Sequence, residues 1–266
     1  MTNSMRPVTL ITGASSGIGA ALARVFAGNG HTLALVARRG ELMNALADDI
    51  VAQGGARPIV IVADLTQPGA AAAIGEALAA AGAEPRYVIN NAGFGLLGSA
   101  ASRDRSEQLA MIDLNMRVLT ELSLAFVDSL ARHRGGLLNV GSVAGFLPGP
   151  GMAVYYASKA YVLSFSEALH SEFKRRGIRV CVLCPGPVPT EFASRAGIVS
   201  TLVPGLLAQS AETVAQAGYR GLMRGRRIIV PGIANKLVTV AVRVLPRQLL
   251  LRIVGGQQRR RAARTA

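Results

Sequence analysis

Short apolar runs rich in β-branched residues alternate with segments of helical length from Val8 to Val230. Strands that are apolar throughout are typical of a parallel sheet, because helices cover both of its faces. The alternation indicates βαβ crossovers between such strands. The chain is therefore predicted to form an α/β fold, a doubly wound parallel sheet of about seven strands in a single domain. The predicted strands are Val8–Thr12, Thr32–Ala37, Ile59–Ala63, Tyr87–Asn90, Leu137–Val140, Val180–Leu183 and Ile228–Val230.

Segments that favour helix lie between the strands, and no linker rich in Gly, Pro or Ser divides the chain. We therefore predict one domain over residues 1–232. A basic, apolar C-terminal extension over residues 233–266 is expected to pack on that domain or to lie peripheral to it. The predicted helices are Gly17–Ala27, Glu41–Gln53, Ala70–Ala81, Ser106–Arg132 and Ala153–Arg176.

The formal net charge of +14 is concentrated near the C-terminus. No acidic residue follows Glu212, and the residues after it contribute twelve positive charges, which leaves a net charge of +2 for the rest of the chain. A nucleic-acid-binding surface on the main domain is therefore not expected. The first apolar run, Val8–Ile11, is too short for a secretory core or a membrane span, so we expect a cytoplasmic protein.

Cys181 and Cys184 form a C-x-x-C pair, a pattern that can indicate redox or metal chemistry. On the predicted strand, however, residues three apart point to opposite faces of the sheet. No second cysteine pair or nearby histidine completes a metal shell. We expect both cysteines to pack in the core and predict no metal site.

The first predicted strand runs directly into a glycine-rich loop and then a helix. Glycines permit a tight turn and a close backbone approach to a pyrophosphate, and the free N–H groups at a helix N-terminus attract that anion. The loop therefore predicts a dinucleotide-binding site. Its predicted contacts are Gly13, Ser15, Ser16, Gly17, Ile18 and Gly19.

The same loop also reads G-x-S-x-G with Ser15 at its centre, as in the nucleophile elbow of an α/β-hydrolase. A hydrolase with this order needs a histidine well downstream. The histidines of the chain, at positions 31, 133 and 170, do not lie in glycine-rich or strand-end settings. The dinucleotide interpretation is therefore preferred.

Arg38 and Arg39 follow the second predicted strand, about eighteen residues after the glycine loop. NAD enzymes usually place an acidic residue here for the ribose 2′-hydroxyl, whereas arginine accommodates the 2′-phosphate of NADP. A solvated basic turn is the alternative interpretation. We predict NADP(H) as the cofactor.

A tyrosine and a lysine four residues apart, Tyr155 and Lys159, share one face of a predicted helix. A phenol with its ordinary pKa near 10 is poorly poised for proton transfer at neutral pH, and a neighbouring ammonium corrects this. Ser142 follows the fifth predicted strand, thirteen residues before Tyr155. We predict Tyr155 as the general acid/base, with Lys159 stabilising its phenolate and Ser142 orienting a substrate oxygen.

In order and position, these motifs resemble the short-chain dehydrogenase/reductase family, in its NADP(H)-preferring branch, whose catalytic domain is a Rossmann fold. The glycine loop matches TGxxxGxG, Asn90–Gly93 matches NNAG, and Pro185–Thr190 matches PGxxxT. The spacing of Ser142, Tyr155 and Lys159 is also that of the family. The similarity spans about Val8 to Thr190.

The resemblance implies further roles. Asn115 would hold a water in a relay to the lysine, and a buried helical asparagine is otherwise costly. Asp64, with Leu65, would contact the adenine, although Asp64 and Thr66 are alternatively a helix cap. The remaining cofactor contacts would be Asn91, Ala92 and Gly93 at the adenosine ribose, Tyr155 and Lys159 at the nicotinamide ribose, and Pro185, Gly186, Val188 and Thr190 at the carboxamide and phosphates.

These residues predict an NADPH-dependent oxidoreductase that interconverts a carbonyl and an alcohol. The alternative is a cofactor-binding regulatory protein on the same fold that has no turnover. The complete Tyr-Lys-Ser-Asn set favours the enzyme. Three mainly apolar segments, Phe94–Leu97, Val143–Met152 and Glu191–Gln209, predict a lipophilic ketone, aldehyde or secondary alcohol as substrate.

The C-terminal stretch Asn235–Val254 is apolar, but arginines and Pro246 interrupt it, so it is not predicted to cross a membrane. The spacing of Lys236, Arg243 and Arg247 places these cations on one face of a predicted helix. Its apolar side either packs against the domain or a partner subunit of a homo-oligomer, a dimer or tetramer, or lies on an anionic membrane surface. Nucleic acid is not expected, because aromatic groups for base stacking are nearly absent there.

Overall fold

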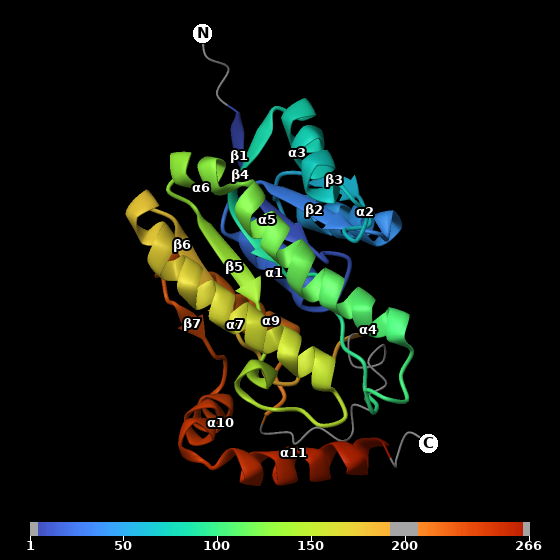
Figure 1. The fold of residues 1–266 in the computed structure, drawn as a ribbon. Helices are drawn as coiled ribbons and strands as arrows, with labels where there is room; N and C mark the ends of the chain where they lie inside the picture. Colours follow the sequence, from blue (N-terminus) through green and yellow to red (C-terminus); the bar gives the residue numbers. More distant parts are fainter. Residues whose placement is uncertain (1–4, 192–206, 263–266) are drawn as a thin grey trace.

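The computed structural model describes residues 5–191 and 207–262, and within them seven strands form one parallel sheet (Figure 1). The strand order β3-β2-β1-β4-β5-β6-β7 confirms the predicted doubly wound fold. The order reverses beside β1, which lies between β2 and β4, and ligands of such sheets bind at the carboxyl ends of the strands there. The strands are β1 (Arg6–Thr12), β2 (Leu33–Ala37), β3 (Ile59–Val62), β4 (Ala83–Asn90), β5 (Gly136–Val140), β6 (Arg179–Leu183) and β7 (Ile228–Ile229).

Helices cover both faces of the sheet, because its strands are apolar on both sides. One core cluster joins the sheet to α1, α2 and α9, and a second joins it to α3, α5, α6 and α7. Fully buried Phe26 anchors the first cluster, and Ile74 and Leu130 anchor the second. These helices are α1 (Gly17–Gly28), α2 (Gly40–Ala52), α3 (Ala70–Ala80), α5 (Leu119–Ala125), α6 (Val127–Arg132), α7 (Ala153–Phe173) and α9 (Ala211–Met223).

The prediction of one continuous helix over Ser106–Arg132 is wrong. The chain forms α4 (Arg105–Ile112), a π-helical segment η1 (Asp113–Val118), α5 and α6 in succession. The wider turn of η1 turns Asn115 inward, where its amide bonds the backbone of Phe94, and such π segments are frequent at functional sites. A second break follows at Phe126, whose backbone leaves the helical region and whose ring is buried in the core.

Cys181 and Cys184 are both free and buried, and they belong to core clusters on opposite faces of the sheet. Burial raises the pKa of each thiol to about 12, which keeps the sulfur protonated and unreactive at neutral pH. Their placement therefore agrees with the packing role expected from the strand geometry.

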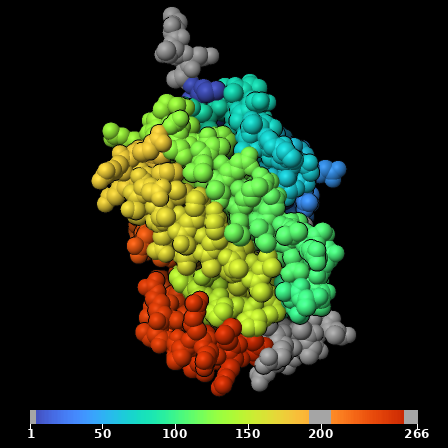
Figure 2. Space-filling view, viewed as in Figure 1, coloured from blue at the N-terminus to red at the C-terminus, as the bar shows by residue number. Residues whose placement is uncertain are grey.

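The C-terminal extension forms two helices, α10 (Ile233–Val244) and α11 (Arg247–Ala262), and not the single predicted one. Leu245 is extended because the following Pro246 excludes the helical conformation at the residue before it. Arg247 therefore belongs to a different helix from Lys236 and Arg243. Both helices lie at the end of the molecule toward which β5 points (Figures 1 and 2). Within the described residues, no helix is both long enough and apolar enough to span a bilayer.

Candidate active site

A cavity of about 1170 Å³ opens at the carboxyl ends of the strands. It exceeds the roughly 300–1,000 Å³ of ordinary small-molecule pockets, as a site for a dinucleotide and a second molecule should. All predicted site residues line it except Gly19 and Asn115. The lining includes Gly13, Ser15, Ser16, Gly17, Ile18, Arg38, Arg39, Asp64, Leu65, Asn91, Ala92, Gly93, Ser142, Tyr155, Lys159, Pro185, Gly186, Val188 and Thr190.

The glycine loop after β1 is held in shape by the end of β4. Gly17 has a φ of 55°, a conformation that favours glycine, and a Cβ at Gly19 would overlap the Gly13 carbonyl oxygen. Gly19 thus packs behind the loop instead of lining the cavity. The amide nitrogen of Asn91 donates to the carbonyl oxygens of Thr12 and Gly13 at 3.0 and 3.2 Å. Asn91 therefore supports the loop through its side chain.

Two serines of this loop contact Arg39, the second arginine after β2. The Arg39 guanidinium donates to the hydroxyls of Ser15 and Ser16 and pairs with Glu191 at 2.8 Å. Ser16 is the N-cap of α1, but its side chain makes no capping bond, so the first N–H groups of that helix are left for a ligand. The Glu191 contact has no signal in the sequence, because it joins residues about 150 positions apart.

Asp64 does not cap a helix, because the N-cap of α3 is Gly69. Its Oδ1 instead accepts hydrogen bonds from the backbone nitrogen and hydroxyl of Thr66, at 3.0 and 2.7 Å. These bonds, with the nearby Arg38 cation, hold the pKa of Asp64 below its ordinary value. Asp64 lines the cavity as a fixed carboxylate acceptor at the end of β3.

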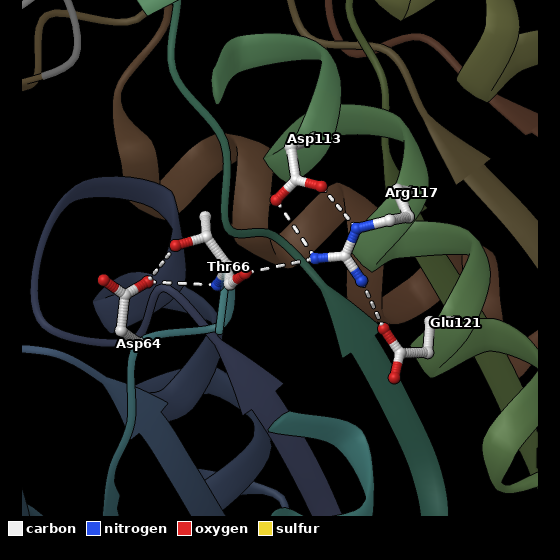
Figure 3. Close-up of polar contacts among 5 residues, drawn as sticks. All are labelled: Asp64, Thr66, Asp113, Arg117 and Glu121. Carbon is white, nitrogen blue, oxygen red and sulfur yellow. Dashed lines mark hydrogen bonds and ion pairs between the residues drawn. The ribbon is translucent and has the colours of Figure 1, made fainter. Parts of the chain in front are cut away.

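Arg117 connects this loop to the π-helical segment (Figure 3). Its guanidinium pairs with Asp113 and, at 2.8 Å, with Glu121, and it donates to the Thr66 carbonyl oxygen at 3.3 Å. The sequence predicted none of this, since Thr66 and Arg117 are 51 residues apart and lie on different elements. The contact ties the loop that carries Asp64 to η1.

Tyr155, Lys159 and Ser142 meet at the floor of the cavity. Burial raises the pKa of Tyr155 to about 12 and outweighs the opposing effect of the nearby Ser142 hydroxyl. The prediction that the neighbouring ammonium lowers the pKa of this phenol is therefore wrong, because desolvation of the phenolate dominates. The Lys159 nitrogen lies 5.9 Å from the centre of the Tyr155 ring and donates to the Val140 carbonyl oxygen at 2.8 Å. Burial lowers the pKa of Lys159 to about 8. A buried phenol is thus placed beside a hydroxyl and an amine that titrates near neutral pH.

Asn115 lies directly behind this group. Its side-chain nitrogen donates to the Phe94 carbonyl oxygen at 2.9 Å and to the Ser158 hydroxyl at 3.1 Å, and its oxygen accepts from the Phe94 nitrogen. Gly93 packs between Asn115 and Lys159, and a Cβ there would lie 2.8 Å from the Asn115 oxygen. The structure places Asn115 next to Lys159 but outside the cavity lining.

The loop after β6 closes the opposite wall. The Pro185 carbonyl oxygen accepts from the Val143 nitrogen at 3.0 Å, which joins this loop to the segment after Ser142. A Cβ at Gly186 would overlap the side chain of Asn235 on α10. Asn235 is therefore a further residue behind the site, and the sequence predicted no such role for it.

Comparison with known proteins identifies the family. A family model described as short chain dehydrogenase matches residues 7–197. The chain belongs to the short-chain dehydrogenase family. Sulfoacetaldehyde reductase of Chromohalobacter salexigens is 37% identical over 80% of this chain and 86% of that protein.

Solved structures of this family superpose well on the chain. The short-chain dehydrogenase from Sphingobium yanoikuyae in complex with NADPH is 35% identical, with a TM-score of 0.79 over 92% of this chain and 95% of that one. The bulky-bulky ketone specific alcohol dehydrogenase from Comamonas testosteroni is 31% identical, with a TM-score of 0.74 over 90% and 92% of the two chains. The chain is therefore an oxidoreductase of the short-chain dehydrogenase family.

The cavity of this short-chain dehydrogenase has an apolar wall beside Tyr155. Phe94, Met152 and Tyr156 pack in one apolar cluster with Tyr155 and line the cavity, which Leu114 and Leu147 also line. Two of the segments predicted to shape the substrate site, 94–97 and 143–152, contribute to this wall. The third, Glu191–Gln209, falls mostly on residues 192–206, which lie outside the described residues.

Proposed function

We propose that this short-chain dehydrogenase uses NADP(H) to interconvert a carbonyl and an alcohol on a lipophilic small molecule, with Tyr155 as general acid/base. The observation that carries the proposal is the group at the cavity floor. There Tyr155 and Ser142 line the cavity side by side, and the Lys159 nitrogen lies 5.9 Å from the centre of the Tyr155 ring. A carbonyl oxygen placed against both hydroxyls has one proton donor and one orienting partner.

The residues present fit a phosphorylated dinucleotide. The glycine loop and the uncapped N-terminus of α1 suit a pyrophosphate, Arg38 and Arg39 suit a 2′-phosphate, and Asp64 suits an adenine amino group. The relative that was solved with NADPH supports the same choice. When bound, the nicotinamide supplies or accepts the hydride.

The chain's own part in reduction is proton transfer. Tyr155 is protonated at neutral pH, because its pKa is about 12, so it can give its proton to the substrate oxygen. The phenolate that remains needs a cation, and Lys159 supplies one below its own pKa of about 8. Asn115 holds the backbone of Phe94 and the Ser158 hydroxyl near Lys159, and we assign it the role of holding the water through which the lysine exchanges protons.

A substrate panel tests the proposal. We expect purified protein to consume NADPH with bulky aryl ketones, followed by the nicotinamide absorbance. Sulfoacetaldehyde should be a poorer substrate, since the sulfonate needs a cation and the described wall beside Tyr155 is apolar. A protein that binds NADPH but turns over neither class would contradict the enzyme proposal.

The pH dependence of the reduction rate should report the protonation state of Lys159. Its pKa is lowered by burial to about 8, so the group is an ammonium below that pH and a neutral amine above it. We expect kcat/KM to be level below the pKa and to fall roughly tenfold per pH unit above it. Tyr155 stays protonated over this range and adds no second step. A profile that remains level up to about pH 9.5, with the fold intact by circular dichroism, would exclude this role for the ammonium.

Replacing Arg117 with alanine should weaken cofactor binding modestly. The change removes the contact that holds the Asp64 loop against η1, and a hydrogen bond to a charged group contributes about 1.5–3 kcal/mol at most. Because the arginine is 45% exposed, we expect only about a 2- to 5-fold rise in the NADPH dissociation constant, measured by fluorescence titration.

Arg24→Ala is the matched control for this variant. Arg24 is 44% exposed and pairs with Asp49 at 3.2 Å, but it does not line the cavity. Its removal should leave the NADPH dissociation constant unchanged. Equal effects of the two substitutions would show that Arg117 acts only through general stability.

A further inference from the structure

Helix α10 presents an aliphatic face to the solvent, whereas its inward side holds buried Asn235 and Thr239 with half-buried Val238 and Val242. Asn235 and Thr239 are 2% and 7% exposed, whereas Ile233, Leu237, Val240 and Val244 are 61–80% exposed. The spacing of these four aliphatic residues, at intervals of four, three and four, places them on one face of the helix. A surface helix of a globular protein normally turns its apolar face toward the core. The exposed apolar face of α10 therefore indicates a binding surface.

Hydrogen bonds on the inner side fix this orientation. The Asn235 amide donates to the carbonyl oxygens of Leu207 and Pro231 at 3.2 and 3.1 Å, and its side chain packs against Gly186. Rotating α10 to bury its aliphatic face would leave the Asn235 amide without these two acceptors and would remove its contact with the loop after β6. The outward apolar face is therefore part of the folded structure.

Positive charges border this apolar face and favour an anionic binding partner. Lys236 and Arg243 are exposed on α10, one position before Leu237 and Val244, and they border the apolar face along one side. No acidic residue follows Glu212 in the sequence. A second copy docked helix to helix by two-fold symmetry would bring these cations together, and neither α10 nor α11 contains a carboxylate to offset them.

Exposed aliphatic side chains also occur on α11. Leu250 and Val254 are buried, whereas Leu249 and Ile253 are exposed, as is Leu245 between the two helices. Arg247 and Arg252 are exposed beside them. Both helices lie together at one end of the molecule, which Figure 2 shows in red. The aliphatic and cationic side chains thus occur together over two adjacent helices.

We propose that the α10–α11 surface binds an anionic lipid bilayer. The aliphatic side chains of α10 would enter the boundary between headgroups and acyl chains, and the neighbouring lysine and arginines would contact the headgroup phosphates. In this arrangement the aliphatic side chains enter an apolar environment and the cations lie beside anionic groups. Water provides no apolar environment, and a second copy of the same two helices provides no anionic groups. The proposal does not depend on the catalytic function, because Ile233, Leu237, Val240 and Val244 do not line the active-site cavity.

Vesicle sedimentation of the full-length protein tests this. The probes are phosphatidylcholine vesicles and vesicles in which about a third of the lipid is phosphatidylglycerol. We expect binding to the anionic vesicles that weakens as salt is raised, and little binding to the neutral ones. The pair K236Q and R243Q should lower the affinity for anionic vesicles by about 30-fold, since each cation contributes roughly one factor of five.

The apolar contribution is tested with Leu237→Ser and Val244→Ser together, which should also reduce vesicle binding at least about tenfold. The control is Val51→Ser with Val62→Ser, two exposed aliphatic residues on α2 and β3, far from this surface along the chain. Wild-type protein that binds neither vesicle type, or binds both equally at every salt concentration, overturns the proposal. So does a dimer, seen by light scattering, that dissociates in the Leu237 and Val244 variant while vesicle binding is absent.

Discussion

Tyr155→Phe will lower kcat for carbonyl reduction by about 10²- to 10⁴-fold, the range that a positioned general acid contributes. The substitution removes the one transferable proton and keeps the ring, its burial and its contacts with the cavity wall. Because the hydroxyl is not needed to hold the dinucleotide at the glycine loop or at the arginines, the NADPH dissociation constant should change less than about twofold. Steady-state rates at saturating NADPH, with a separate fluorescence titration, measure both quantities.

Tyr156→Phe is the matched control, since Tyr156 lines the same cavity on the same helix. It lies one residue further along, so its hydroxyl points about 100° away around the helix axis from that of Tyr155. Its loss should change kcat only a few-fold. If the Tyr155 variant kept a tenth of the wild-type rate, or if both variants lost activity equally, the assignment of the general acid would be wrong.

Wild-type protein will bind NADPH more tightly than NADH by about 10- to 150-fold, as expected for one charge-assisted contact to the 2′-phosphate. Arg38→Asp should erase or reverse this preference. The new carboxylate repels the 2′-phosphate and can accept a hydrogen bond from the 2′-hydroxyl of NADH. Arg38 is the informative position, because it lines the cavity next to Asp64, whereas Arg39 is already paired with Glu191. Dissociation constants for the two cofactors, measured under identical salt, give the ratio.

Arg175→Asp makes the same charge change at the opposite ends of the strands, in the short 3-10 segment Lys174–Arg176 that precedes β6. It should leave the ratio of the two dissociation constants unaltered. A wild-type ratio near one, or an Arg38 variant that retains the full NADPH preference, would contradict NADP(H) as the intended cofactor.

Most of the site could be predicted from local motifs, for a topological reason. In a parallel sheet every strand ends at the same edge, so residues that immediately follow different strands converge in space. Ser142, Asp64 and Arg38 are far apart in sequence, yet each follows a strand, and all three line one cavity. The helical spacing of Tyr155 and Lys159 likewise needed no tertiary information, because four residues along a helix return to the same face.

Residues that act through another element could not be predicted in this way. Arg117 and Thr66 meet only because η1 passes the end of β3, and Asn235 lies behind Gly186 only because α10 docks there. Neither contact has a period, a motif or a fixed spacing that a sequence pattern could reveal. The π-helical turn at Asn115 belongs to the same class, since it occurs together with hydrogen bonds to Phe94 in another segment.

The amino-acid sequence by itself determined the parallel sheet, the position of the glycine loop after β1 and the residues of the proposed catalytic group, because each depends on hydrophobic period or on short-range spacing. It also determined that the C-terminal segment has an apolar and a cationic character. Only the tertiary structure decided which side of α10 faces outward. Amphipathicity defines two faces of a helix but not their orientation, and here the hydrogen bonds of buried Asn235 hold its side of α10 against the domain and leave an aliphatic face exposed.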